Sequence, residues 1–275
     1  MATIRTILKK DSPSNNGKFP VYIRISDRGK RLHFATGFEA SWVTGVSSSG
    51  VFIKDPDTTW PSSVSGIPKG WTIYPTVVPA DAEAVDLGLS VKWATCNLGA
   101  TRPEKYGSYF AWGETLPKNA YGANTYKWCM AYNQLTKYCT NKLFGYNGFT
   151  DGLSELSPED DAVQTLLGGK RRMPTEAEMT ELINQCTWKS TALNGINGWQ
   201  VTGPTGNMIF LPAAGGWSDN EECDDPGVFG HYWSSKMDVS LQTHAYSLWL
   251  YADEVSCSSG GSPRAFGYSI RPVFD

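Results

Sequence analysis

The first forty residues alternate between apolar and polar side chains, as short β-strands do. Residues 3–8, 20–26 and 31–36 each show this alternation. A tight-turn signal, Asp-Arg-Gly-Lys at residues 27–30, separates the last two stretches. The pattern therefore predicts a small antiparallel β module over residues 1–43.

Residues 44–82 lack a sustained hydrophobic period. They are rich in Ser, Gly and Pro, and short β-prone pieces stand at residues 51–53 and 71–74. This composition is typical of a connector with short strands. We therefore expect the next domain to begin near residue 83.

A denser aromatic and glycine pattern begins at residue 83. Apolar residues occupy every second position from Val85 to Val91, and Trp93 continues the phase. Alternation of this kind predicts a half-buried strand.

Two capping signals predict helices. Thr175 with Glu178 forms a capping box, from which we expect a helix that ends near Asn184. A Ser-Pro pair at residues 157–158 predicts a second helix over residues 159–167, which two glycines end.

Short strands and long loops are predicted after Cys186. Residues 198–201 and 207–211 flank a turn-rich connection, and residues 245–251 alternate. The part of the chain over residues 83–275 is therefore expected to be an α+β domain with few helices, short strands and long loops.

Composition adds an uneven charge distribution. The 275 residues include 11 Trp, 13 Tyr and 11 Phe, enough for a large core, and the net charge is −3. Residues 1–36 carry eight Lys or Arg against two Asp, so the rest of the chain holds nine net negative charges. The asymmetry indicates two modules with different surfaces. The overall charge gives no general attraction to nucleic acid or to anionic membranes.

The chain start shows no targeting signal. The first ten residues have no apolar core of a secretory signal. No apolar run approaches the ~20 residues that cross a bilayer. We therefore expect no membrane insertion, and a location in the cytoplasm or in a virion that assembles there.

Six cysteines and three histidines limit the chemistry. The cysteines show no C-x-x-C pair, which disfavours metal clusters and thioredoxin-like redox chemistry and leaves disulfides open.

The N-terminal stretch MATIRTILKK…GKFPVYIRISDRGKRLHFATGF resembles the arm-type DNA-binding domain of tyrosine recombinases from Bacteroidetes and their mobile elements. The resemblance covers residues 1–40, and no catalytic recombinase domain follows. It implies DNA binding through residues 1–40. A small basic β module used for attachment or assembly is the interpretation we prefer, because a few basic residues on a sheet are a common solvated surface.

Five fragments stand in order in the last hundred residues: RRMPTEAEMTELI, LPAAGGW, YWSS, AYSLWL and GYSIRPV. With VDLGLSVKWATCNLGA and YGSYFAWGET, they resemble the C-type-lectin-like fold. That fold is shared by relatives of the formylglycine-generating enzyme and by variable proteins of diversity-generating retroelements in Bacteroidetes or their phage. The resemblance covers residues 83–275. It implies a non-catalytic ligand-binding protein with a diversified surface, of the kind found in phage receptor-binding components.

The same resemblance leaves an enzyme of the formylglycine-generating type as the alternative. Its reactive cysteines would be Cys223 and Cys257, but acidic neighbours of Cys223 raise a thiol pKa. Iron-dependent relatives need three histidines, and His33 belongs to the N-terminal module. Calcium-binding lectin tripeptides are absent. We therefore expect no catalysis, no cofactor and no metal site.

The ligand-binding face is predicted around one strand. Leu248 and Leu250 point inward with period two, so Ser247, Trp249 and Tyr251 point the other way. The resemblance places ligand contacts on this face and in the adjoining loops. The predicted ligand-binding residues are Lys236, Asp238, Gln242, His244, Ser247, Trp249, Tyr251, Glu254, Ser256, Ser258, Ser259, Ala265, Phe266 and Tyr268.

An alternative leaves Trp249 and Tyr251 as ordinary core under the loop at residues 257–263. Arg271 is expected to tie a loop by hydrogen bonds, and His244 to be a surface residue and not a metal ligand. Buried framework positions are predicted at Trp93, Trp112, Trp199, Trp217, Tyr232 and Trp233.

The resemblance also implies the partners. The ligand would be a cell-surface protein or glycan, and kinship with phage variable proteins implies a homotrimer.

Overall fold

The computed structural model divides into two compact units, Met1–Val78 and Pro79–Asp275. It describes the backbone of residues 3–8, 19–27 and 30–40. It also describes residues 83–275 except 119, 132–133, 219–222, 252–253 and 258–260. The predicted connector at residues 44–82 lies outside the described residues.

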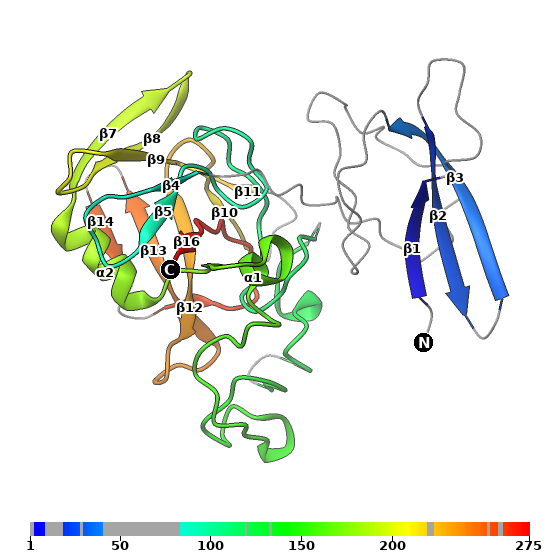
Figure 1. The fold of residues 1–275 in the computed structure, drawn as a ribbon. Helices are drawn as coiled ribbons and strands as arrows, with labels where there is room; N and C mark the ends of the chain where they lie inside the picture. The colour runs from blue at the N-terminus through cyan, green and yellow to red at the C-terminus, as the bar shows by residue number, and fades with distance from the viewer. Residues whose placement is uncertain are drawn as a thin grey trace. The chain divides into compact units, whose positions relative to one another are not determined.

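The first unit contains a three-stranded antiparallel sheet, as the alternation predicts (Figure 1). Its strands are β1 (Thr3–Leu8), β2 (Phe19–Asp27) and β3 (Lys30–Ala40), in the order β1-β2-β3. Asp27 pairs with Lys30, which fits the predicted tight turn. Strand β3 continues four residues beyond the predicted end at Thr36.

The second unit is mostly β with few helices, an α+β arrangement. Its two long antiparallel sheets are β7-β8-β9 and β12-β13-β14, and β15 also pairs with β13 (Figure 1). The strands are β7 (Thr187–Leu193), β8 (Ile196–Thr202), β9 (Met208–Pro212), β12 (Gly230–Met237), β13 (His244–Tyr251), β14 (Glu254–Cys257) and β15 (Ser262–Pro263).

A third sheet joins the beginning and the end of this unit. It runs β4-β5-β16-β6 and pairs Trp93 of β5 with Val273 of β16. Its members are β4 (Ala84–Val85), β5 (Lys92–Ala94), β6 (Arg171–Arg172) and β16 (Val273–Phe274), and β10 (Gly216–Trp217) with β11 (Cys223–Asp224) forms a separate pair.

The prediction of one continuous strand from Val85 to Trp93 is wrong. Two short strands, β4 and β5, stand at its ends; residues 86–91 between them are not in a strand, and residues 88–91 form a bend. Gly88 has a φ of 82°, and its amide donates to the Asp86 side chain over 2.9 Å. An Asx turn of this kind breaks the strand while still leaving Leu87 in the core.

The capping box predicted at Thr175 is present. Helix α2 (Glu176–Gln185) begins after Thr175, whose hydroxyl accepts from the Glu178 amide, and the Glu178 carboxylate accepts from the Thr175 amide. Met179 and Leu182 form its buried side. Helix α1 (Ala162–Leu167) begins three residues later than predicted, because the Asp161 side chain caps it. The short 3-10 helices are η1 (Ala123–Thr125) and η2 (Tyr146–Gly148).

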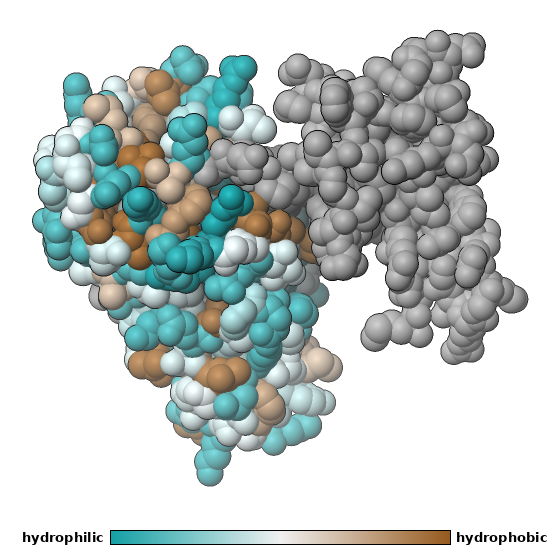
Figure 2. Space-filling view, viewed as in Figure 1, coloured by the Kyte–Doolittle hydropathy of each residue, from teal (hydrophilic) through white to brown (hydrophobic). Residues whose placement is uncertain are grey.

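The main core lies between α2 and the sheets β7-β8-β9 and β12-β13-β14. Its buried members are Leu87, Trp93, Met179, Leu182, Trp199, Val201, Ile209, Leu211, Ala213, Tyr232, Leu248, Leu250 and Val273. The predicted burial of Trp93, Trp112, Trp199, Tyr232 and Trp233 is confirmed, whereas Trp217 is half-buried. On the face shown in Figure 2, apolar residues of this unit emerge as scattered patches among polar ones.

Candidate ligand-binding site

The sheet β12-β13-β14 has two different faces. Leu248 and Leu250 of β13 are buried in the main core, as the period-two pattern predicts. Ser247, Trp249 and Tyr251 therefore project from the opposite face. This second face is where the candidate site lies.

Cross-strand pairing adds residues to that face. His231 of β12 stands opposite Trp249, and on the other side Trp249 faces Ser256 of β14. Tyr251 is paired with Glu254. Because directly opposed residues share one face of a sheet, these side chains line the same surface.

Five rings meet on this face and form what we call the aromatic cluster: Phe229, His231, Trp249, Tyr251 and Tyr268. His231 stands edge-on to Trp249 at 5.3 Å and to Phe229 at 5.0 Å between ring centroids. Its other side stacks on Tyr268 at 4.6 Å. Phe229 and Trp249 lie 5.7 and 6.0 Å from Tyr251. Offset and edge-on contacts at these distances are favourable, so the rings hold one another in place.

Hydrogen bonds fix the Trp249 indole. Its Nε1 donates to the Ser247 hydroxyl over 2.7 Å and to the Ser262 hydroxyl over 3.2 Å. The two hydroxyl oxygens are themselves 2.9 Å apart. Trp249 is thus half-buried, with its polar atom turned toward β15. The alternative that Trp249 and Tyr251 are ordinary buried core does not agree with this arrangement, because Trp249 is half-buried and Tyr251 is exposed.

Tyr251 marks the open end of the aromatic cluster. Its side chain is 38% exposed, and its partner Glu254 is exposed as well. Phe229 and Ser256 beside them are half-buried. A ligand that approaches this end contacts the rings of Tyr251 and Phe229 and the carboxylate of Glu254.

His231 is the most deeply enclosed member of the cluster. It is 6% exposed, and its Nδ1 is buried with no hydrogen-bond partner among the described residues. Burial lowers the pKa of His231 to about 4. The imidazole is therefore neutral near pH 7 and behaves as another aromatic ring.

Four predicted contact residues are buried, so their predicted contact with a ligand is corrected. The Ser247 hydroxyl lies against that of Ser262 in β15, and the Tyr268 ring is enclosed between His231 and Trp233. Asp238 accepts hydrogen bonds from the Ser240 and Leu241 amides, and Gln242 accepts from the Thr140 and Asn141 amides. These side chains satisfy loop backbone groups, which is why polar residues occupy buried positions there.

The predicted contact residues as a set do not form one patch. One group lies at the end of the β12–β13 pair where Met237 is opposite Ala245; its members are Lys236, Asp238, Gln242 and His244. His231 and Trp249 are paired nearer the opposite end of the same two strands. Lys236, His244, Ala265 and Phe266 are half-buried. Phe266 reaches the cluster through Tyr268, at 6.3 Å. Ser258 and Ser259 lie outside the described residues.

Sequence reasoning missed Phe229 and His231 as site residues. The available signal was the alternation in GHYWSS: once Tyr232 faces the core, His231 must face the other way. Phe229 precedes the strand, where period two gives no information, and only the fold brings it to Tyr251.

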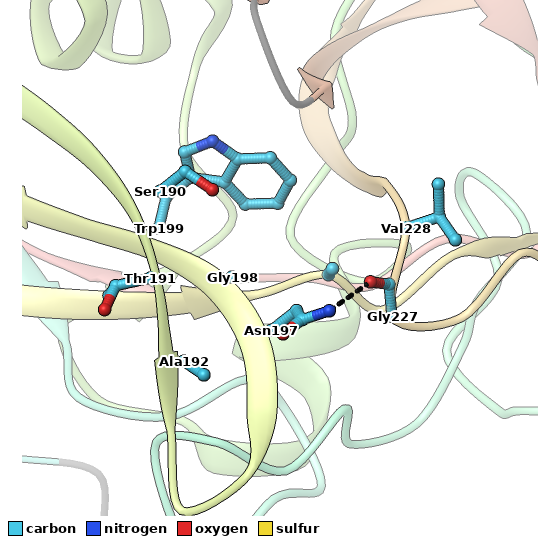
Figure 3. Close-up of a pocket in the computed structure, with 9 residues that line it drawn as sticks. Ser190, Thr191, Ala192, Asn197, Gly198, Trp199, Gly227 and Val228 are labelled. Carbon is cyan, nitrogen blue, oxygen red and sulfur yellow. Dashed lines mark hydrogen bonds between the residues drawn. The ribbon is translucent and has the colours of Figure 1, made fainter.

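An open hollow of about 510 Å³ lies between the β7–β8 hairpin and the segment that leads to Phe229 (Figure 3). The Asn197 side-chain amide donates to the Gly227 carbonyl over 3.0 Å and links the two walls. None of the lining residues carries an ionisable side chain, so the hollow suits an uncharged group. They are Ser190, Thr191, Ala192, Asn197, Gly198, Trp199, Ala213, Gly227 and Val228.

The cysteine candidates for catalysis are poorly activated. Cys223 and Cys257 are both free thiols. Burial raises the pKa of Cys223, and the Asp224 carboxylate raises it further. Burial, with Glu176 nearby, raises the pKa of Cys257 to about 12. Both groups are thus protonated near pH 7, which weakens them as nucleophiles.

No cluster of three or more metal-ligating side chains occurs within the described residues. In the same part of the chain, no helix is long and apolar enough to cross a membrane. No protein-family model, no curated protein and no solved structure matches this chain.

Proposed function

We propose that residues 83–275 form a C-type-lectin-like, non-catalytic ligand-binding domain of the kind that diversity-generating retroelements diversify. Its ligand would be a cell-surface protein or a glycan, and the chain would serve as a receptor-binding component, as in a phage. The observation that carries the proposal is the aromatic cluster with its open end at Tyr251.

The construction of the cluster supports binding. Trp249 and Tyr251 are large rings with few rotatable bonds, and each loses little conformational entropy on contact. The Trp249 indole is fixed by its hydrogen bonds to Ser247 and Ser262, and His231 is fixed by its stack on Tyr268. The surface is therefore ordered before a ligand binds. A surface ordered in advance avoids part of the entropic cost of association.

The proposal does not include chemistry at the cysteines. Cys223 and Cys257 both have raised pKa values for which burial is the main cause. Maleimide labelling of the native chain near pH 7 should modify both far more slowly than in the unfolded chain. Rapid labelling of either thiol would favour the enzymatic alternative.

Ligand binding is tested with a double variant. A glycan array and a displayed library of surface proteins are first screened with the full chain. Trp249→Ala with Tyr251→Ala should then weaken binding of the best ligand at least tenfold, because central aromatic contacts each contribute about 1 kcal/mol or more. Tyr146→Ala, at an exposed tyrosine of η2, should leave the Kd unchanged. An unchanged Kd in the double variant would show that the site is elsewhere.

The origin of the domain has a separate test in the neighbouring DNA. A reverse-transcriptase gene and a near-copy of the 3′ end of this coding sequence, differing at adenines, would support the retroelement proposal. Absence of both from a complete genome that encodes this chain would remove it.

A further inference from the structure

No lysine or arginine side chain of the described residues covers the rings of the aromatic cluster, whereas several other rings of the second unit are covered in this way. Elsewhere in the second unit, Lys127 Nζ lies 4.0 Å from the centroid of the Trp128 ring, and Arg264 lies 5.1 Å from that of Trp112. Lys118 is similarly placed over Tyr121, at 5.5 Å. Within the described residues, no Lys or Arg lies over a ring of the aromatic cluster.

Among the described residues, the charged side chains that act on the tyrosines of the cluster are carboxylates. Glu254 is the cross-strand partner of Tyr251, and both side chains are exposed. Burial raises the pKa of Tyr251, and the Glu254 carboxylate raises it further. At the inner end, burial raises the pKa of Tyr268 to about 12, and Asp224 of β11 adds to the rise. Two carboxylates thus act on the rings from different strands.

The polar atoms of the cluster leave little for a neutral or acidic ligand. Trp249 Nε1 already donates to the Ser247 and Ser262 hydroxyls. His231 is enclosed and neutral near pH 7. What remains open is the ring surface of Phe229 and Tyr251, with the Tyr251 hydroxyl at its edge and the Glu254 carboxylate beside it. The face of an aromatic ring carries partial negative charge, so rings and carboxylate together attract a cation.

We propose that the open end of the aromatic cluster binds a cationic group of a protein ligand, a lysine or arginine side chain, between Tyr251, Phe229 and Glu254. The inference rests on the proposed function and specifies its ligand. The alkyl stem of the basic residue packs against the rings, and its charge approaches the carboxylate.

Choline is a suitable probe, because 3,3-dimethyl-1-butanol has nearly the same shape and no charge. Binding of each compound to the full chain is measured by ligand-observed saturation-transfer NMR. Sodium chloride is added to the alcohol samples so that both series have the same ionic strength. Choline should bind at least threefold more tightly than the alcohol, as expected for cation–π attraction at a partly exposed site.

Variants locate the binding. Tyr251→Leu removes the ring but keeps an apolar side chain, and Glu254→Gln removes only the charge. Each substitution should raise the Kd of choline several-fold. Each should also reduce the ratio between the Kd of the alcohol and the Kd of choline. The matched controls Tyr146→Leu and Glu83→Gln alter an exposed tyrosine and an exposed glutamate elsewhere, and should change nothing.

The outcomes separate this inference from the proposed function. Equal affinities for choline and the alcohol overturn the inference. So does the absence of a choline signal at concentrations on the order of 50 mM, which would saturate a site with a Kd of ~1 mM. If the Trp249→Ala, Tyr251→Ala chain still loses its ligand in either case, the face binds and only its preference for cations is wrong. If that double variant binds its ligand normally, the ligand-binding site lies elsewhere, and the role proposed for this face fails together with the inference.

Discussion

Arg271 shows how a single charged residue can order several segments at once. It is fully buried, and its guanidinium donates to the carbonyls of Ala94, Thr95 and Phe210 and to the Asn97 side chain, over 2.7–3.0 Å. The expectation that Arg271 ties a loop by hydrogen bonds is confirmed. The sequence indicated the role, but only the fold identifies the acceptors.

Replacing Arg271 with Lys should destabilise the second unit by about 3 kcal/mol. A lysine cannot reproduce the planar fork, so buried carbonyls lose their donors. Urea unfolding followed by tryptophan fluorescence measures the loss. Arg102→Lys, at an exposed arginine, is the control. A change below about 0.5 kcal/mol at Arg271 would contradict the role assigned to its fork.

His231 should make stability depend on pH. Its folded pKa of about 4 lies below the ~6.5 of an unfolded histidine. Between these values the unfolded chain binds a proton and the folded chain does not, so stability falls as pH falls from about 6.5 to 4. The total loss from this group is about 3 kcal/mol.

The test compares His231→Phe with the native chain in urea unfolding at several pH values. The variant keeps a ring in the cluster and removes the titration, so its stability should fall less between pH 6.5 and 4. Burial also lowers the pKa of His244, but that residue is present in both chains and its effect cancels. If the free energies of unfolding of the native chain and of His231→Phe fall equally with pH, the prediction is contradicted.

At the scale of elements, the capping box and both helix ends were predicted closely, whereas the start of α1 and the extent of one strand were not. The Thr175 capping box is visible in the sequence because its partners are three residues apart. Helix α1 begins later than predicted because Asp161 caps it, and the same side chain accepts from the distant Met173 amide over 2.8 Å. The strand predicted from Val85 divides into two because Asp86 and Gly88 form a turn.

Thr175→Ala should destabilise the second unit by about 1 kcal/mol. The substitution removes the oxygen that accepts from the Glu178 amide at the start of α2. Urea unfolding of the full chain measures the loss. Thr101→Ala, at an exposed threonine, should stay within about 0.5 kcal/mol of the native chain. Equal effects of the two substitutions would show that the cap contributes nothing.

At the scale of the whole molecule, the second unit should fold without the first. Residues 79–275 form a compact unit with its own core. Expressed alone, they should unfold in urea with the midpoint of the corresponding transition in the full chain, and should bind choline with the same Kd. A midpoint lowered by more than the error of the fit would contradict this independence. The predicted boundary at residue 83 remains a prediction.

The sequence by itself determined which way side chains face within an element. In β13, Leu248 and Leu250 point to the core and Trp249 and Tyr251 point away, because period two is a local property of an extended chain. It did not determine which outward residues stay accessible. Exposure depends on what packs above a strand, and here Ser262 lies against Ser247. Tertiary structure also brought Phe229 and His231 to Tyr251 from a separate loop and strand, a juxtaposition that no local pattern encodes.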